Sequence, residues 1–236
     1  IGKHCMCIIV SKSIDGSKIL AKNRDRAYKP SLEIVHTIIN GVEVVYLRDI
    51  ITDWSEGMNE FGIGLVNTAL IKDVIQSAIT FDGGIKGHTF ISTPYKMISI
   101  ETTSKHNPKF KLYTDEDVVR TNHGHLHHGA GYTKGPDYLS SKLRKISAEK
   151  MITRAETVDD ILPLMRTKLY KHTSNLNMMR DTDKMFTSSQ LLLDLTNSVL
   201  KLTYRENQIE SFEGINRVLP EGYTPKIKIV VTKLPN

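Results

Sequence analysis

Two cysteines, Cys5 and Cys7, are the residues of this 236-residue sequence that could supply a thiolate nucleophile. They are the only cysteines in the chain, and they stand one residue apart where its first apolar run begins. Two thiols are too few for a disulfide framework or a structural zinc site. A single thiolate, in contrast, is enough to attack a carbonyl carbon and form an acyl-enzyme.

A cysteine that becomes the first residue of a chain carries its own general base. The pKa of an α-amino group is about 7.7–8.0, so a useful fraction is neutral at pH 7 and can take the thiol proton. Because Ile1–His4 precede Cys5, we expect this segment to be a leader that self-cleavage removes. The alternative interpretation is that both cysteines are small buried hydrophobes, which is common for this residue.

The elements that must position these thiols are mainly strands in the first two-thirds of the chain. The dipeptides Asp15-Gly16 and Asn40-Gly41 are strong turn signals, and each predicts a β-hairpin. The expected strands are Met6–Val10, Lys18–Ala21, Glu33–Ile39, Val42–Leu47, Phe61–Val66, Met97–Thr102, Phe110–Tyr113, Val118–Arg120, Ser189–Leu195, Val199–Tyr204 and Lys226–Thr232.

Two helices are expected between these groups of strands. Apolar periodicity predicts a helix over Ser140–Ile152, with Leu143, Ile146 and Met151 on its buried face, and a second helix over Val158–Leu169. Hairpins with an inserted helix pair favour a layered α+β architecture over a doubly wound nucleotide-binding fold. We expect one domain, residues 1–236, without a membrane span, because no apolar run approaches about 18 residues.

The charge of the chain is mildly basic, with 32 Lys+Arg against 26 Asp+Glu and a net charge of +6. The basic residues are scattered and do not alternate with aromatic ones, so no nucleic-acid partner is expected. The start of the sequence lacks the apolar segment of a signal peptide, which predicts a cytoplasmic protein without a membrane partner. A homo-oligomer stays an open alternative.

Four motifs, in order along most of the chain, resemble the N-terminal nucleophile (Ntn) hydrolases. The similarity is to the branch of choloylglycine hydrolase and acyl-CoA:6-aminopenicillanic acid acyltransferase. The motifs are Cys5–Val10 with Ala21–Asp25, then Gly57–Asn67, Thr121–His123 and Ser140–Arg144. The resemblance implies a four-layer αββα sandwich. It also implies a cysteine hydrolase or acyltransferase that cleaves a non-peptide amide bond of a small molecule, without a cofactor or metal.

The resemblance also assigns catalytic roles to four polar residues. Asp25 would hold the α-amino group, and Lys22 stands where the family has an arginine beside the thiol. Asn67 would donate its side-chain amide to the oxyanion, a contribution worth about 10²–10³ in rate. Asn122 would orient the α-amino group or the oxyanion. The lysine is a departure, because it cannot form the bidentate fork of an arginine. Alternative roles are a surface ion pair with Arg24 or Arg26 for Asp25, a turn or cap position for Asn67 and a loop position for Asn122.

The nucleophile can be either cysteine, because the family spacing falls between them. Cys5 fits a Cys-x-small-hydrophobic pattern, whereas Cys7 fits a Met-Cys-Ile-Ile start that occurs in related proteins. The motif that ends at Asn67 favours Cys5 slightly, and both cysteines stay candidates.

A histidine-rich stretch, residues 123–128, supports a different class of site. It holds four of the nine histidines, and imidazole is a common metal ligand. No carboxylate or thiol stands at metal-ligand spacing, so we expect a loop along the cleft, with His123 as a substrate contact. The two rival hypotheses are a histidine-loop metalloenzyme and a catalytically inactive protein that keeps the fold for binding.

Overall fold

The computed structural model describes residues 6–70, 86–103, 105–171, 173–205 and 211–234, and these form two sheets and two α-helices. The first sheet has the order β10-β1-β2-β12-β13-β15, with β11 paired to β12. Its strands are β1 (Ile8–Ile14), β2 (Ser17–Arg26), β10 (Val118–Arg120), β11 (Asp181–Thr182), β12 (Met185–Asp194), β13 (Val199–Tyr204) and β15 (Lys228–Lys233).

The second sheet has the order β14-β3-β4-β5-β6-β7-β8-β9. Its strands are β3 (Ser31–Ile39), β4 (Val42–Asp49), β5 (Trp54–Asn59), β6 (Gly64–Ala69), β7 (Gly87–Ser92), β8 (Met97–Thr102), β9 (Lys109–Tyr113) and β14 (Ser211–Val218). The helices are α2 (Gly135–Ile152) and α3 (Ile161–Met165), with short 3-10 turns at Val158–Asp160 and Ser174–Leu176.

Both predicted hairpins are confirmed. Asp15 and Gly16 have φ values of 49° and 72°, and Asn40 and Gly41 have 50° and 80°. Positive φ at both central residues is the geometry of a type I′ turn, whose twist matches that of the flanking strands. The Asp15-Gly16 turn sets the register of β1 against β2, which pairs Ile8 with Asn23.

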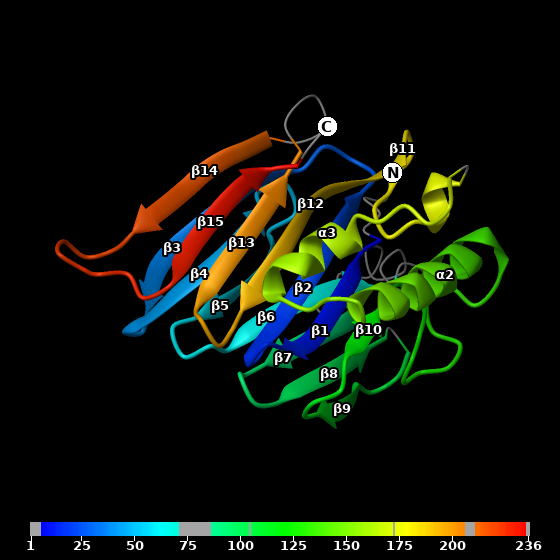
Figure 1. The fold of residues 1–236 in the computed structure, drawn as a ribbon, viewed down its shortest axis with the longest axis horizontal. Coiled ribbons are helices and arrows are strands. Elements are labelled where there is room, and N and C mark those ends of the chain that lie inside the picture. Colours follow the sequence, from blue (N-terminus) through cyan, green and yellow to red (C-terminus); the bar gives the residue numbers. More distant parts are fainter. Residues whose placement is uncertain (1–5, 71–85, 104, 172, 206–210, 235–236) are drawn as a thin grey trace.

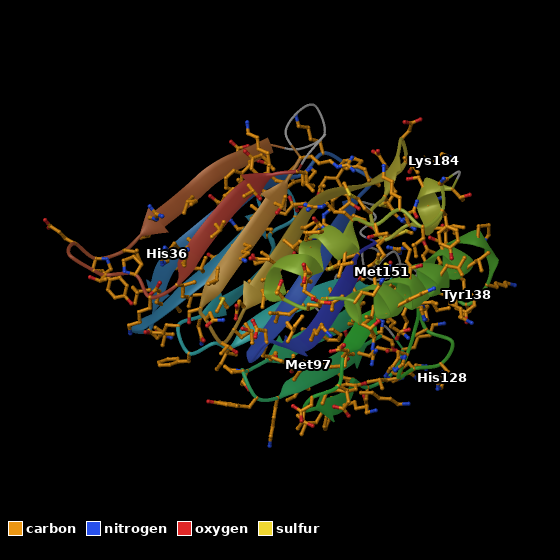
Figure 2. The ribbon with its side chains drawn as sticks, viewed as in Figure 1. His36, Met97, His128, Tyr138, Met151 and Lys184 are labelled. Atoms are coloured by element: carbon orange, nitrogen blue, oxygen red, sulfur yellow. The ribbon has the colours of Figure 1, made fainter. Side chains whose placement is uncertain are left out.

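The main core lies between the two sheets, and a second core lies between the first sheet and the helices. Leu20, Val45 and Val66 belong to the first core, whereas Val10, Ala148 and Met165 belong to the second. Figure 1 shows α2 and α3 over the face of the sheet that contains β1, β2 and β12. Met151 lies toward α3, and Tyr138 lies near the other end of α2 (Figure 2).

The expectation of a four-layer αββα sandwich is wrong. The described structure is 48% strand and 14% helix, and its helices cover only the first sheet. Along β4 of the second sheet, Val45 and Leu47 are buried while the alternate residues are half-buried. This alternation is typical of an antiparallel sheet with one face in the core and the other toward solvent. Phe110 on β9 is 76% exposed, so the layers in the described residues are α, β and β.

Three element predictions also need correction. The strand predicted at Phe61–Val66 begins only at Gly64, because Gly62 closes a turn with φ of 72° and Phe61 is 64% exposed. The buried face of α2 contains Ser141, Arg144, Ala148 and Met151, whereas Ile146 is 54% exposed. The predicted second helix is reduced to α3 and the 3-10 turn before it. Neither described helix is long and apolar enough to cross a bilayer.

Candidate functional site

Cys7 lies immediately before β1 and is fully buried. Its Sγ accepts a hydrogen bond from Arg26 Nη1 at 3.3 Å. Its backbone carbonyl accepts one from Thr68 Oγ1 of β6 at 3.2 Å. Both sheets therefore hold this residue in place. Cys5 and the expected leader, Ile1–His4, lie outside the described residues.

Asp25 on β2 is a buried carboxylate in a cluster of arginines. Its Oδ2 lies 3.0 Å from Arg144 Nη1 and 3.7 Å from Arg180 Nε, and its Oδ1 accepts a hydrogen bond from Thr187 Oγ1 at 2.7 Å. Burial raises the pKa of Asp25 to about 6, although Arg144 and Arg180 oppose that shift. Asp25 is thus not part of a surface ion pair, and a large share of it is ionised at pH 7.

Arg144 contacts candidate residues that come from separate motifs of the sequence. Its Nη1 donates to the backbone carbonyl of Met6 at 3.4 Å as well as to Asp25. Its Nη2 donates to Asn122 Oδ1 at 2.8 Å. Burial lowers the pKa of Arg144 to about 9, which still leaves the guanidinium charged at pH 7. A cation therefore touches the peptide carbonyl that directly precedes Cys7.

Asn122 is fully buried, and its amide group is occupied by protein partners. Its Nδ2 donates to Thr68 Oγ1 at 3.1 Å and to the carbonyl of Ala69 at 2.7 Å. Both amide hydrogens are thus used, and Oδ1 accepts from Arg144. In this geometry Asn122 positions Arg144 and β6 and has no donor left for an oxyanion.

Lys22 and Asn67 belong to a second buried cluster between the sheets. Lys22 Nζ forms an ion pair with Glu56 and donates to Asn67 Oδ1 at 3.3 Å. Arg24 pairs with the other oxygen of Glu56. Burial alone would raise the pKa of Glu56, but Lys22 and Arg24 hold it below its ordinary value. The cation that touches the thiol is Arg26, whereas Lys22 pairs with Glu56.

His123 packs against α2. Its Nδ1 lies 2.9 Å from Ser141 Oγ, and its ring meets Tyr138 edge-on at 5.8 Å between centroids. Burial lowers the pKa of His123 to about 4, with a smaller contribution from Lys145. The ring is therefore neutral at pH 7, and its Nδ1 faces a protein hydroxyl.

The rest of the histidine-rich stretch is anchored by Glu101. Its carboxylate accepts the backbone N–H groups of His125 and Leu126 at 2.8 Å and of His127 at 2.9 Å. His127 stacks on His106, and both rings line a cavity of ≈ 480 Å³ together with Lys109 and His128. Within the described ranges, no group of three or more His, Cys, Asp or Glu side chains is arranged to hold a metal ion.

Three arginines of this site were not among the sequence candidates. Arg26 directly follows a predicted motif, and Arg144 is the last residue of another. Small residues one turn before and after Arg144, Ser141 and Ser147, leave room for a buried guanidinium. Arg180 follows a 3-10 turn in an irregular segment, and no sequence pattern marks it.

Comparisons with known proteins add no assignment. No protein-family model matches the chain, and no curated protein matches it. The function must therefore be inferred from the geometry around Cys7.

Proposed function

We propose that the protein is a cysteine amidohydrolase or acyltransferase that uses Cys7 as its nucleophile after cleaving its own Met6–Cys7 bond. One observation carries the proposal: Arg144 Nη1 contacts both the Met6 carbonyl and the Asp25 carboxylate beside the buried thiol of Cys7. The four motifs that resemble Ntn hydrolases support the same chemistry. They also imply that the substrate is a small-molecule amide.

The self-cleavage would begin with attack of Cys7 Sγ on the carbonyl carbon of Met6. A C–S bond forms and the C–N bond to Cys7 breaks, while the departing nitrogen gains a proton and becomes the α-amino group. Water then hydrolyses the thioester and releases a carboxylate at Met6. Arg144 Nη1, which contacts the Met6 oxygen, would stabilise the oxyanion that forms there, and the charge of Arg26 would stabilise a thiolate.

Asp25 would hold the new amino group. The backbone N–H of Met6 donates to the carbonyl of Asp25 at 3.4 Å, so Met6 lies beside Asp25 of the neighbouring strand. Once Met6 has been removed, the new amino group of Cys7 lies one residue along the chain from this contact. The neutral amino group would take the thiol proton, and the carboxylate of Asp25 would accept a hydrogen bond from the ammonium group that results. The ammonium group would then return the proton to the leaving amine of a substrate.

The proposal is tested by intact-mass analysis and thiol labelling of the purified protein. We expect a mass that corresponds to a chain beginning at Cys7, and a thiol-directed activity probe that labels Cys7 under native conditions. A stable, uncleaved and unlabelled protein would contradict the proposal and favour a binding role for the same fold. A thiol nucleophile must stay reduced, so we also propose a reducing compartment such as the cytoplasm.

The pH dependence of hydrolysis should reflect the pKa of Asp25. Because that pKa is raised to about 6, acidification below pH 6 protonates the carboxylate and removes the acceptor for the α-ammonium group. Protonation of the α-amino base, whose pKa is about 7.7–8.0, lowers kcat/KM roughly tenfold per pH unit. Loss of the Asp25 carboxylate should add to this, so we expect the slope to steepen below about pH 6. An Asp25→Asn variant should be slow at all pH values and should lack this steepening. A wild-type profile whose slope does not change between pH 7 and pH 5 would exclude the role of Asp25.

A further inference from the structure

The side chain of Met6 occupies a small closed site beside the thiol. Met6 is 4% exposed and packs against Ala69 and Met185, with Trp54 and Tyr132 at the edge of the cluster. At its far end, Sδ receives Arg180 Nη1 at 3.5 Å and Tyr132 Oη at 3.9 Å. The site is therefore apolar along its sides and has two hydrogen-bond donors at its end.

We infer that this site is the acyl subsite of the mature enzyme and that it accepts a straight acyl chain ending in a carboxylate, such as glutaryl. The inference rests on the proposed function. In self-cleavage the residue that contributes the acyl group to Cys7 is Met6. A substrate carbonyl would be attacked by the same sulfur and would face the same Arg144. Its acyl chain would therefore lie where the Met6 side chain lies in the uncleaved protein.

The length of the chain follows from the covalent structure of methionine. From the carbonyl carbon, Cα, Cβ and Cγ lead to Sδ as the fifth atom. Glutaryl has its terminal carboxyl carbon at that fifth position. The close packing of Ala69 and Met185 against Met6 disfavours branches along the chain.

The terminal carboxylate follows from the donors and from the charge. A thioether is a weak acceptor, so Arg180 and Tyr132 make poor hydrogen bonds to Met6. A carboxylate would accept from both and would form a charge-assisted bond with the guanidinium. Among the described residues, Asp25 is the carboxylate that pairs with both Arg144 and Arg180, with Asp137 acting on Arg180 at longer range. The α-ammonium group of Cys7 would add a further positive charge, and a substrate carboxylate would offset it.

The reaction of such a substrate is balanced without a cofactor. Cys7 Sγ forms a bond to the acyl carbon, the C–N bond of the amide breaks, and the amine leaves with the proton held by the α-amino group of Cys7. Water then hydrolyses the glutaryl thioester and gives glutarate and the free thiol.

The test compares glutaryl and hexanoyl p-nitroanilides, which have similar lengths but differ in terminal charge. We expect the mature enzyme to favour the glutaryl substrate by at least about tenfold in kcat/KM, in line with hydrogen bonds to a charged group. Tyr132→Phe should lower the rate with the glutaryl substrate several-fold and change the hexanoyl rate much less, because an alkyl end accepts no hydrogen bond from Oη. Tyr138→Phe is the matched control, because Tyr138 packs against the His123 ring and is not part of the Met6 cluster, and it should alter neither rate.

The outcomes separate this inference from the proposed function. Equal or better hydrolysis of the hexanoyl substrate, or a Tyr132→Phe variant that slows both substrates alike, overturns the acidic acyl subsite while cysteine hydrolysis stands. If neither substrate is hydrolysed and the probe leaves Cys7 unlabelled, the proposed function fails and the subsite inference fails with it.

Discussion

Cys7→Ala abolishes both self-cleavage and amide hydrolysis, whereas Cys5→Ala changes neither: this is the result that we expect. Cys7 lies beside Arg26, Asp25 and the Met6 carbonyl that Arg144 contacts. Loss of a catalytic nucleophile costs on the order of 10⁴-fold or more in kcat. Intact mass measures the cleavage, and release of p-nitroaniline measures the hydrolysis.

One further variant makes this comparison decisive. Cys7→Ser keeps the size of the side chain, so it separates loss of the nucleophile from a packing defect at this buried position. We expect it to fold like the wild type, with a melting temperature within a few degrees, and to cleave much more slowly. If Cys5→Ala is the inactive variant and Cys7→Ala is active, the nucleophile assigned here is wrong.

Arg144→Gln should have the largest effect on stability, a loss of about 3 kcal/mol in the free energy of unfolding. Arg144 is fully buried between Asp25 and Asn122. Removal of one partner from a buried ion pair typically costs about 3–5 kcal/mol, because the other charge stays buried. We expect the lower end of that range, since Arg180 and Thr187 still contact Asp25. The midpoint of urea unfolding measures the change.

Lys142→Gln is the matched control for this variant. Lys142 lies on the same helix but is exposed, so its loss should change stability by less than about 0.5 kcal/mol. The double variant Arg144→Gln, Asp25→Asn should recover part of the loss, because it leaves no unpaired carboxylate. If the double variant loses as much free energy of unfolding as the two single variants together, or more, the Asp25–Arg144 pair does not carry the stability.

The sequence predicted the hairpins well because their turns are determined locally. Asn40-Gly41 and Asp15-Gly16 need no distant contacts to adopt positive φ. The buried face of α2 was predicted only in part. Met151 is buried as expected, but Leu143 and Ile146 suggested an apolar stripe while the fold uses that helix to bury Arg144. A periodicity rule counts apolar residues and therefore misses a helix whose inner face serves a polar site.

The sequence predicted which residues form the candidate site better than it predicted which of them contact one another. Asp25, Asn67, Asn122 and Lys22 are all buried, yet Asp25 pairs with Arg144 of α2, and Lys22 pairs with Glu56 rather than with the thiol. Spacing along one strand cannot show which cation on the next strand reaches a sulfur, because that depends on the stacking of the two sheets. The prediction of a second helical layer was wrong for a related reason. It followed from short motifs, and such motifs specify the residues of a site more closely than the elements around it.

Thr68 has a consequence for the timing of maturation. Its hydroxyl donates to the Cys7 carbonyl, 61 residues away in sequence, and accepts from Asn122, 54 residues away. Contacts between such distant segments form late, after the loops between them have closed. The bond before Cys7 is thus held against Arg144 only once both sheets and α2 have assembled. A newly made chain would then be unable to cut itself until it has folded, and cleavage would report the completed fold.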